Sequence, residues 1–292
     1  MTLSSSDPGD EELRVANSTV FRAGSYSFPI GMKTYVMGIL NITPDSFSDG
    51  GKWRSVEEAV ARALQMERDG ADIIDVGGES SRPGYIPISA EEEMARVIPV
   101  IEALRQTLQI PISIDTWKSP VARTAVTAGA SIINDIWGCQ RDPVIADVAA
   151  ETGAGLILMY NATDPAIHAS GTDILASATS FLCRSIETAR GAGVPDHSIL
   201  IDPGIGFGMD SEDSLRLIRN IPVLSRLNYP LLLGPSRKRF IGAVLDKPVE
   251  ERMLGTVAVC CTSACMGVDF VRVHDVLEVV QALRMVDAVI RG

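Results

Sequence analysis

The sequence contains no long hydrophobic run. No uninterrupted apolar stretch reaches the ~18 residues that a membrane-spanning helix needs. Residues 1–15, MTLSSSDPGDEELRV, are acidic and polar, with neither the basic start nor the apolar centre of a signal peptide. We therefore expect a cytoplasmic protein that does not associate with a membrane.

Positive charge is also in short supply. The chain has 26 Lys and Arg residues against 37 Asp and Glu residues, so its formal net charge is −11. Proteins that bind nucleic acid usually carry clustered basic residues, and this acidic balance argues against nucleic acid as a partner. An anionic ligand would have to be held by local cations that overcome the overall field.

Cysteines are few and follow no pattern. Cys260, Cys261 and Cys265 share one apolar segment, whereas Cys139 and Cys183 stand alone. This odd number fits neither a disulfide framework nor a zinc site, so we predict reduced, buried side chains.

Apolar runs of strand length alternate with segments of helical period along most of the chain. Residues 1–32 lack this pattern, and we predict a loosely ordered N-terminal extension followed by a single domain at 33–292. The clearest predicted helix is 55–70, with Ser55 as its N-cap and Gly70 at its end. The predicted strands are 35–41, 72–77, 111–115, 131–135, 155–160, 198–202, 230–234 and 269–273.

This alternation predicts an α/β fold, a (β/α)8 TIM barrel. Near-continuous apolar strands indicate a parallel sheet that is covered on both faces. Eight strand–helix units in about 260 residues is the count of such a barrel. A doubly wound open sheet is the alternative, but it would have fewer strands and a Gly-rich fingerprint after the first, which this sequence lacks.

Polar residues recur at or just after the C-terminal end of every predicted strand, where a barrel of this kind concentrates its chemistry. A buried polar side chain is unfavourable unless it is paired or used. Because the pattern repeats on all eight strands, we predict one shared site. Its candidates are Asn41; Glu79, Ser80, Ser81 and Arg82; Asp115; Asn134 and Asp135; Tyr160 and Asn161; Asp202; residues 236–239; and Arg272 with His274.

One group of these candidates suits a flat heterocycle. Asp115, Asn134, Asp202 and Lys238 combine hydrogen-bond acceptors with one cationic donor. A ring with amino and lactam edges requires this combination. The set lacks the His and Cys cluster of a zinc site.

A second group is cationic. Arg272 and His274 lie two residues apart on a strand, so both side chains point to the same side, and Arg82 joins them at the strand ends. Two guanidiniums and an imidazole predict a clamp for a phosphorylated group. The alternative is structural: His274 caps the following helix, and Arg272 pairs with a neighbouring acid.

The sequence shows no arrangement for covalent catalysis. It has neither a Ser-His-Asp or Cys-His set nor a Gly-x-Ser-x-Gly elbow. The segment DPGIGFGMD is rich in glycine, and we predict that it forms a tight loop on the pocket wall. A site that holds a ring at one end and a phosphate at the other indicates displacement of that phosphate as a leaving group.

At these residues the sequence resembles the dihydropteroate synthase family. The resemblance spans about residues 37–275, and its first, second and last segments are long and unusual. The segments are MGILNITPDSFSDGG, IIDVGGESSRPG, SIDTWK, INDIWG, IDPGIGFG, SRKRF and VRVHDV.

The resemblance implies a (β/α)8 homodimer that condenses 6-hydroxymethyl-7,8-dihydropterin diphosphate with p-aminobenzoate and releases pyrophosphate. It implies no protein nucleophile, since Mg²⁺ and cationic side chains stabilise the departing pyrophosphate while the neutral aniline attacks. The residues that it implies are Asp115, Asn134, Asp202 and Lys238 for the pterin; Asn41 for Mg²⁺ and, with Ser81, Arg82, Arg272 and His274, for the diphosphate; and Phe47, Pro83 and Phe207 for the p-aminobenzoate site that sulfonamides and sulfones occupy. The catalytic residues would be Lys238, Arg272 and His274.

Four positions depart from the family pattern: Tyr160, Asn161, Met209 and Pro235. We expect the first three to line the pterin wall, where an amide without a partner would weaken binding by ~1–3 kcal/mol. Two other functions therefore stay open. One is a catalytically deficient paralogue that binds pterin diphosphate weakly, keeps the p-aminobenzoate site and has a binding or regulatory role. The other is a pterin-dependent methyltransferase domain, which would not need SSRPG and RVHD.

Overall fold

Eight parallel strands form a closed barrel in the computed structural model, which describes residues 19–42, 52–79, 87–163 and 172–291. The strands pair in the order β8-β7-β6-β5-β4-β3-β10-β9, and a parallel bridge from Ile201 to Leu231 joins β8 to the chain just before β9. The strand bounds are β3 Tyr35–Asn41, β4 Ile73–Gly77, β5 Ile112–Asp115, β6 Ile132–Asp135, β7 Gly155–Met159, β8 Ile199–Asp202, β9 Leu232–Leu233 and β10 Phe270–Val273.

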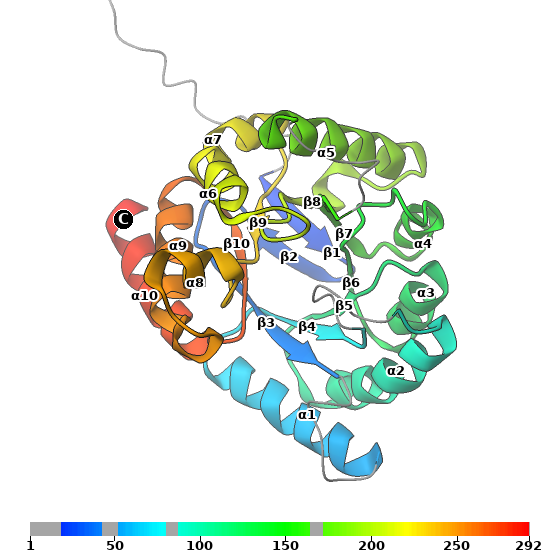
Figure 1. Cartoon of the computed structure of the whole chain (residues 1–292). Helices are drawn as coiled ribbons and strands as arrows, with labels where there is room; N and C mark the ends of the chain where they lie inside the picture. The colour runs from blue at the N-terminus through cyan, green and yellow to red at the C-terminus, as the bar shows by residue number, and fades with distance from the viewer. Residues whose placement is uncertain (1–18, 43–51, 80–86, 164–171, 292) are drawn as a thin grey trace, which may run out of the picture.

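Helices surround the strands on all sides (Figure 1). Each of the eight predicted strands is present, and the closed sheet rules out the doubly wound alternative. One predicted helix start is wrong, because α1 begins at Lys52 and not after Ser55. The main helices are α1 Lys52–Arg68, α2 Ala90–Thr107, α3 Ser119–Ala128, α4 Val144–Thr152, α5 Ile174–Gly191, α6 Ser211–Arg219, α7 Ile221–Leu224, α8 Arg239–Leu245, α9 Met253–Cys265 and α10 Val276–Ile290.

A β-hairpin closes the N-terminal end of the barrel. Its strands, β1 Val20–Ala23 and β2 Tyr26–Pro29, pair antiparallel. Phe21 and Phe28 are buried, and their rings lie 5.7 and 5.6 Å from that of Phe270, at the start of β10. The prediction of a loosely ordered extension over 1–32 is therefore wrong for this hairpin, because Phe21, Ala23 and Phe28 are buried in the cluster at this end of the barrel. Residues 1–18 lie outside the described part of the chain.

The hairpin leaves the opposite end of the barrel, where the strands terminate, as the open end. Side chains that point into the barrel near the hairpin are apolar, and they include Met37, Ile73, Ile132 and Leu200. Polar residues take over toward the strand C-termini. The fold therefore brings the predicted polar side chains together above this apolar layer. We call the group formed by Asp115, Asn134, Asp202, Lys238 and Arg272 the polar basin.

Two smaller predictions can also be compared with the structure. All five cysteines are free, and Cys139 and Cys260 are buried as predicted, but Cys265 is exposed. Within the described residues, no helix is long and apolar enough to span a lipid bilayer.

Candidate active site

Arg272 occupies the centre of the polar basin. Its Nε donates a hydrogen bond to Asp75 Oδ2 at 2.6 Å, and its Nη2 donates to Asp115 Oδ2 at 2.6 Å. Asp75 Oδ2 also accepts from Asn134 Nδ2 at 3.1 Å. One guanidinium therefore joins strands β4, β5 and β10, and Asn134 adds β6 to the same network.

Asp75 belongs to this network but was missing from the sequence-based set. Its side chain is fully buried in β4, and its Oδ1 has no hydrogen-bond partner among the described residues. The signal was present in the run DIIDVG, where a carboxylate interrupts a buried apolar strand. The predicted site residues lie at or just after strand ends, whereas Asp75 lies two residues before the end of β4.

Arg272 and Asp115 form an ion pair that is largely shielded from solvent. Burial raises the pKa of Asp115, and the Arg272 guanidinium opposes that rise. The alternative prediction, that Arg272 pairs with a neighbouring acid, is thus confirmed. It does not exclude a ligand, because Nη1 of the guanidinium takes no part in these two bonds.

Lys238 and Asp202 form the second charged part of the basin. Burial lowers the pKa of Lys238 to about 8, although the Asp202 carboxylate favours the charged ammonium. Burial raises the pKa of Asp202 to about 6, against the effects of Lys238 and of the Gly204 N–H, which donates to Asp202 Oδ1 at 2.7 Å. Both groups therefore change charge near neutral pH.

The loop that follows β8 positions Lys238. The Lys238 ammonium donates to the Ile205 carbonyl and lies 4.5 Å from the centre of the Phe207 ring. Gly206 has a positive φ of 81°, and a Cβ there would lie 2.9 Å from Lys238 Cδ. The prediction that DPGIGFGMD forms a tight loop is confirmed, since Gly204, Gly206 and Gly208 all have positive φ.

His274 lies just after β10 and is fixed by Ser236. The two side chains form a hydrogen bond of 2.8 Å between His274 Nδ1 and Ser236 Oγ. Helix α10 has Asp275 at its N-cap and receives no side-chain hydrogen bond there, so His274 does not cap it. His274 and Arg272 both extend from the same end of β10, as the sequence predicts.

Several predicted residues cannot be placed in the basin. Phe47, Ser81, Arg82 and Pro83 lie outside the described residues. Asn41 is described; it ends β3, and its side chain is exposed. A Cβ at Gly77 would lie 3.7 Å from Asn41 Oδ1 and 3.6 Å from Asp115 Oδ2, so the two oxygens face a common gap above this glycine.

Two other strand-end residues have structural partners. Asp135 accepts hydrogen bonds from the backbone N–H groups of Trp137, at 2.8 Å, and Cys139, at 2.6 Å, and closes the turn after β6. Glu79 accepts from the Lys118 ammonium at 2.6 Å. These carboxylates support the rim of the basin.

An apolar cluster borders the basin on the side of β5 to β8. It consists of Ile136, Trp137 and Met159, with Trp117 and Phe207 packed against it. We call it the mouth wall. Because Phe207 also contacts Lys238, the mouth wall and the polar basin share an edge. A flat ring bound in the basin would contact polar side chains along its edge and apolar side chains on its face.

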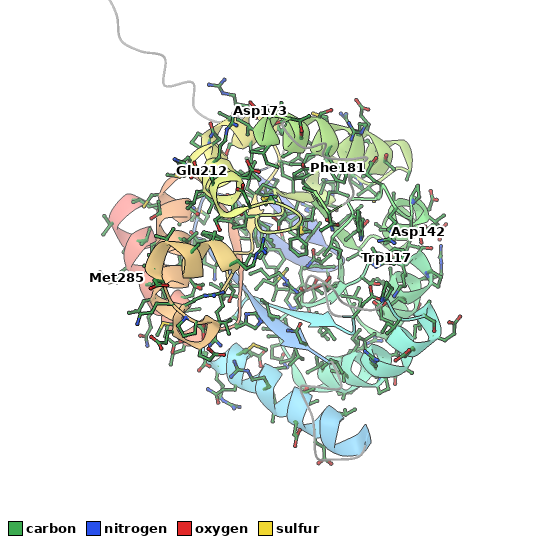
Figure 2. All side chains as sticks on the ribbon, viewed as in Figure 1. Trp117, Asp142, Asp173, Phe181, Glu212 and Met285 are labelled. Atoms are coloured by element: carbon green, nitrogen blue, oxygen red, sulfur yellow. The ribbon has the colours of Figure 1, made fainter. Side chains whose placement is uncertain are left out.

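The expected place of Tyr160 is wrong. Its ring is completely buried between the barrel and α5, and it packs against Phe181 with ring centroids 5.3 Å apart. Figure 2 shows Phe181 on α5, outside the barrel. Met209 is likewise buried in the cluster between strands and helices. Neither side chain belongs to the mouth wall, because strand and loop geometry turns both toward the helices.

Asn161 lies beside the mouth wall, yet both the nitrogen and the oxygen of its side-chain amide have hydrogen-bond partners. Its Nδ2 donates to the Ile136 carbonyl at 3.1 Å. Its Oδ1 accepts from the Thr163 backbone N–H at 3.0 Å and from the Thr163 hydroxyl at 2.6 Å. The expected penalty for an unpaired amide does not apply. Pro235 is buried, and its carbonyl accepts from the Lys238 N–H at 3.2 Å, which supports the turn before α8.

Replacing Asn161 with methionine should therefore destabilise the protein and should not strengthen pterin binding. Asn161→Met leaves the Ile136 carbonyl and the Thr163 N–H without partners, so we expect the free energy of unfolding to fall by about 1–3 kcal/mol. Urea denaturation and titration with pterin diphosphate measure the two effects. Tighter binding at unchanged stability would instead restore the expectation of a damaged wall.

Comparison with known proteins identifies the family. The model of the family described as "Pterin binding enzyme" matches residues 37–274. Dihydropteroate synthase of Bacillus subtilis is 51% identical over 258 residues, which cover 88% of this chain and 89% of the relative. The chain belongs to the dihydropteroate synthase family. Relatives with this name favour the synthase over the methyltransferase alternative.

Solved structures of the family share the barrel. The dihydropteroate synthase of Clostridium difficile, crystallised in the presence of pteroic acid, is 46% identical with a TM-score of 0.86, covering 91% of this chain and 100% of its own. The Xanthomonas albilineans enzyme with 4-aminobenzoic acid is 41% identical with a TM-score of 0.87, covering 94% of this chain and 98% of its own.

Proposed function

We propose that this chain is an active, cytoplasmic, homodimeric dihydropteroate synthase that condenses 6-hydroxymethyl-7,8-dihydropterin diphosphate with p-aminobenzoate. One observation carries the proposal. Three aspartates, an asparagine, a lysine and an arginine converge on one basin of the barrel, with the mouth wall along its edge. The homodimer and the cytoplasmic location rest on the family resemblance and on the sequence.

The basin suits a pterin ring by its chemistry. Asp115, Asn134 and Asp202 offer oxygen acceptors to the ring's amino and lactam N–H groups, and Lys238 offers a charged donor to its carbonyl oxygen. The unpartnered Oδ1 of Asp75 supports this assignment, because a buried acceptor without a donor is unfavourable until one is supplied. Ile136 and Met159 of the mouth wall would cover the ring face.

The diphosphate would lie on the β3 and β10 side of the basin. Arg272 and His274 face it from β10, and the resemblance adds Ser81 and Arg82. The exposed amide oxygen of Asn41 is a hard ligand that fits Mg²⁺, which is commonly held by few protein groups together with water and substrate phosphates. Bound there, Mg²⁺ would neutralise charge on the leaving diphosphate.

The acceptor amine would enter over Phe207, with Pro83 and Phe47 assigned by resemblance. The p-aminobenzoate nitrogen forms a bond to the pterin methylene carbon as the carbon–oxygen bond to the diphosphate breaks. The electron pair leaves with pyrophosphate, and the new ammonium then releases a proton to water. The residues of the basin orient both partners and stabilise departing charge, so no side chain need act as a nucleophile.

A synthase assay tests the proposal. Purified protein with pterin diphosphate, labelled p-aminobenzoate and Mg²⁺ should form dihydropteroate. Removal of Mg²⁺ with EDTA should lower the rate on the order of a hundredfold, and excess Mg²⁺ should restore it. No product, together with tight binding of a labelled sulfonamide, would support the deficient paralogue. Product formation unaffected by EDTA would remove the metal assignment alone.

A further inference from the structure

Two tryptophans of the mouth wall hold an arginine between them. Trp117 lies two residues after β5 and Trp137 two residues after β6, so the two indoles come from equivalent places on adjacent strands. The Arg141 guanidinium carbon lies 4.4 Å from the Trp117 ring centre and 4.7 Å from the Trp137 ring centre. Both distances are within the ~6 Å range of a cation–π contact.

The backbone beside Arg141 is firmly anchored. Asp142 Oδ2 accepts from the Ser119 N–H at 2.8 Å, and its Oδ1 accepts from the Val144 N–H at 3.2 Å. These bonds tie the loop to the starts of α3 and α4. Figure 2 shows Trp117 on the barrel side of these helices, with Asp142 beside it and farther out. The backbone next to Arg141 is thus held in place, and its exposed side chain contacts both indoles.

Trp117 is also held from its other edge. Its Nε1 donates to Glu79 Oε1 at 3.2 Å. The other oxygen of Glu79 accepts from the Lys118 ammonium at 2.6 Å, and the same ammonium donates to Glu93 at 2.6 Å. The hydrogen bond to this charged cluster fixes the orientation of the Trp117 indole within its plane, whereas the Arg141 guanidinium contacts the face of the ring.

Arg141 has no other described partner to explain its place. It is exposed, and it forms neither a salt bridge nor a hydrogen bond with a described residue. By contrast, Arg123 on the neighbouring helix α3 pairs with Glu151 at 2.6 Å, as a surface arginine usually does. In a chain of net charge −11, an arginine that contacts two indoles and no acid of the described residues is an unusual choice.

We propose that Arg141 is a positioning residue, which holds Trp117 and Trp137 as a rigid wall and thereby sets the affinity of the basin for a flat ring. The inference rests on the proposed function. It follows from the shared cluster: Trp137 packs with Ile136 and Met159, to which the proposed function assigns the ring face, so motion of the indoles would loosen that face. Arg141 lies on the β6 side, across the barrel from β10, and acts on ring binding and not on the leaving group.

Three substitutions separate this role from plain packing. Arg141→Ala should weaken binding of pterin diphosphate about three- to tenfold, since it removes two cation–π contacts. Arg141→Met keeps the aliphatic stem without the charge and should resemble Arg141→Ala. Arg141→Lys keeps a cation and should recover most of the affinity. Arg123→Ala is the matched surface control and should bind as the wild type does.

Calorimetric titration and steady-state kinetics give the decisive readouts. The KM for pterin diphosphate should rise with the dissociation constant, whereas kcat and the KM for p-aminobenzoate stay within about twofold. In a Trp53→Phe background, tryptophan emission reports Trp117 and Trp137 and should shift in Arg141→Ala but not in Arg123→Ala.

The possible failures are distinct. If the wild type binds no pterin diphosphate, the proposed function fails and the inference fails with it. If the wild type binds and Arg141→Ala binds equally well, the inference alone fails. Wild-type affinity in Arg141→Met would also overturn it, because packing of the stem and not the cation would then hold the wall.

Discussion

Arg272→Ala should lower synthase activity by orders of magnitude and strongly destabilise the fold. The guanidinium neutralises two carboxylates that have little access to water: the side chain of Asp75 is 0% exposed and that of Asp115 is 13% exposed. Breaking a buried ion pair by removing one partner typically costs about 3–5 kcal/mol of folding stability. Loss of a cation that stabilises departing charge should lower kcat/KM by about 10²–10³.

The loss of stability should depend on pH. Burial already raises the pKa of Asp115, and removing Arg272 takes away the charge that opposes the rise. The folded state then binds a proton more tightly than the unfolded state. The penalty is therefore largest at alkaline pH, where the carboxylate is charged, and shrinks as falling pH protonates it. Urea denaturation at pH 8.5 and at pH 5.5, with ~0.1 M salt to limit screening differences, measures the change.

Two further variants test the cause of this effect. Arg219 pairs with Glu212 on an exposed helix surface, so Arg219→Ala should change stability by no more than about 1 kcal/mol. Adding Asp75→Asn and Asp115→Asn to Arg272→Met removes all three charges and should regain stability without activity. Equal stability of Arg272→Ala and wild type at pH 8.5 would show that the network is dispensable.

The fold could be predicted from sequence because its signal is repeated. Eight apolar runs, each followed by a helical segment, all predict the same barrel, so one wrong helix start does not change the predicted fold. The polar basin was predictable for the same reason, since Asp115, Asn134, Asp202 and Arg272 lie within the last two residues of their strands and Lys238 lies in the loop after β9. The hairpin at Val20–Pro29 was missed because it has a single copy and only two large anchors.

Side-chain direction could not be predicted from single positions. Tyr160 directly follows a strand whose last residue, Met159, belongs to the mouth wall, and the alternation of the strand turns Tyr160 outward to Phe181. The prediction of an unpaired amide at Asn161 is wrong for two reasons: the Ile136 carbonyl, 25 residues earlier, is brought to Nδ2 by the tertiary structure, and a local turn brings the Thr163 N–H to Oδ1. A residue that departs from a family pattern therefore indicates lost function only if the structure places its side chain in the site.

Lys238 should give the synthase an alkaline limit close to pH 8. Burial lowers the pKa of Lys238 to about 8 from the ordinary lysine value of 10.5. Above that pH the amine is neutral in the free enzyme and no longer offers a charged donor, so kcat/KM for pterin diphosphate should fall as pH rises. Asp202, with a pKa of about 6, should define the acid limit, because its protonated form loses acceptor capacity and attraction for Lys238. The profile should be a bell between these values.

Two substitutions at Lys238 isolate its part in the profile. Lys238→Met removes the donor at every pH and should lower kcat/KM by about 10²–10³. Lys238→Arg remains charged up to pH 12 or so and should move the alkaline limb out of the measured range, at some loss of rate from altered geometry. Any limb that wild type and Lys238→Arg share belongs to the substrates or to another group. A wild-type rate that stays constant to pH 10, or an alkaline limb near 8 in both proteins, would disprove the role of Lys238. An alkaline limb that moves to higher pH in Lys238→Arg would instead show that the pH response comes from the buried Lys238 ammonium. The loop after β8 and the turn at Pro235 hold this group in the basin.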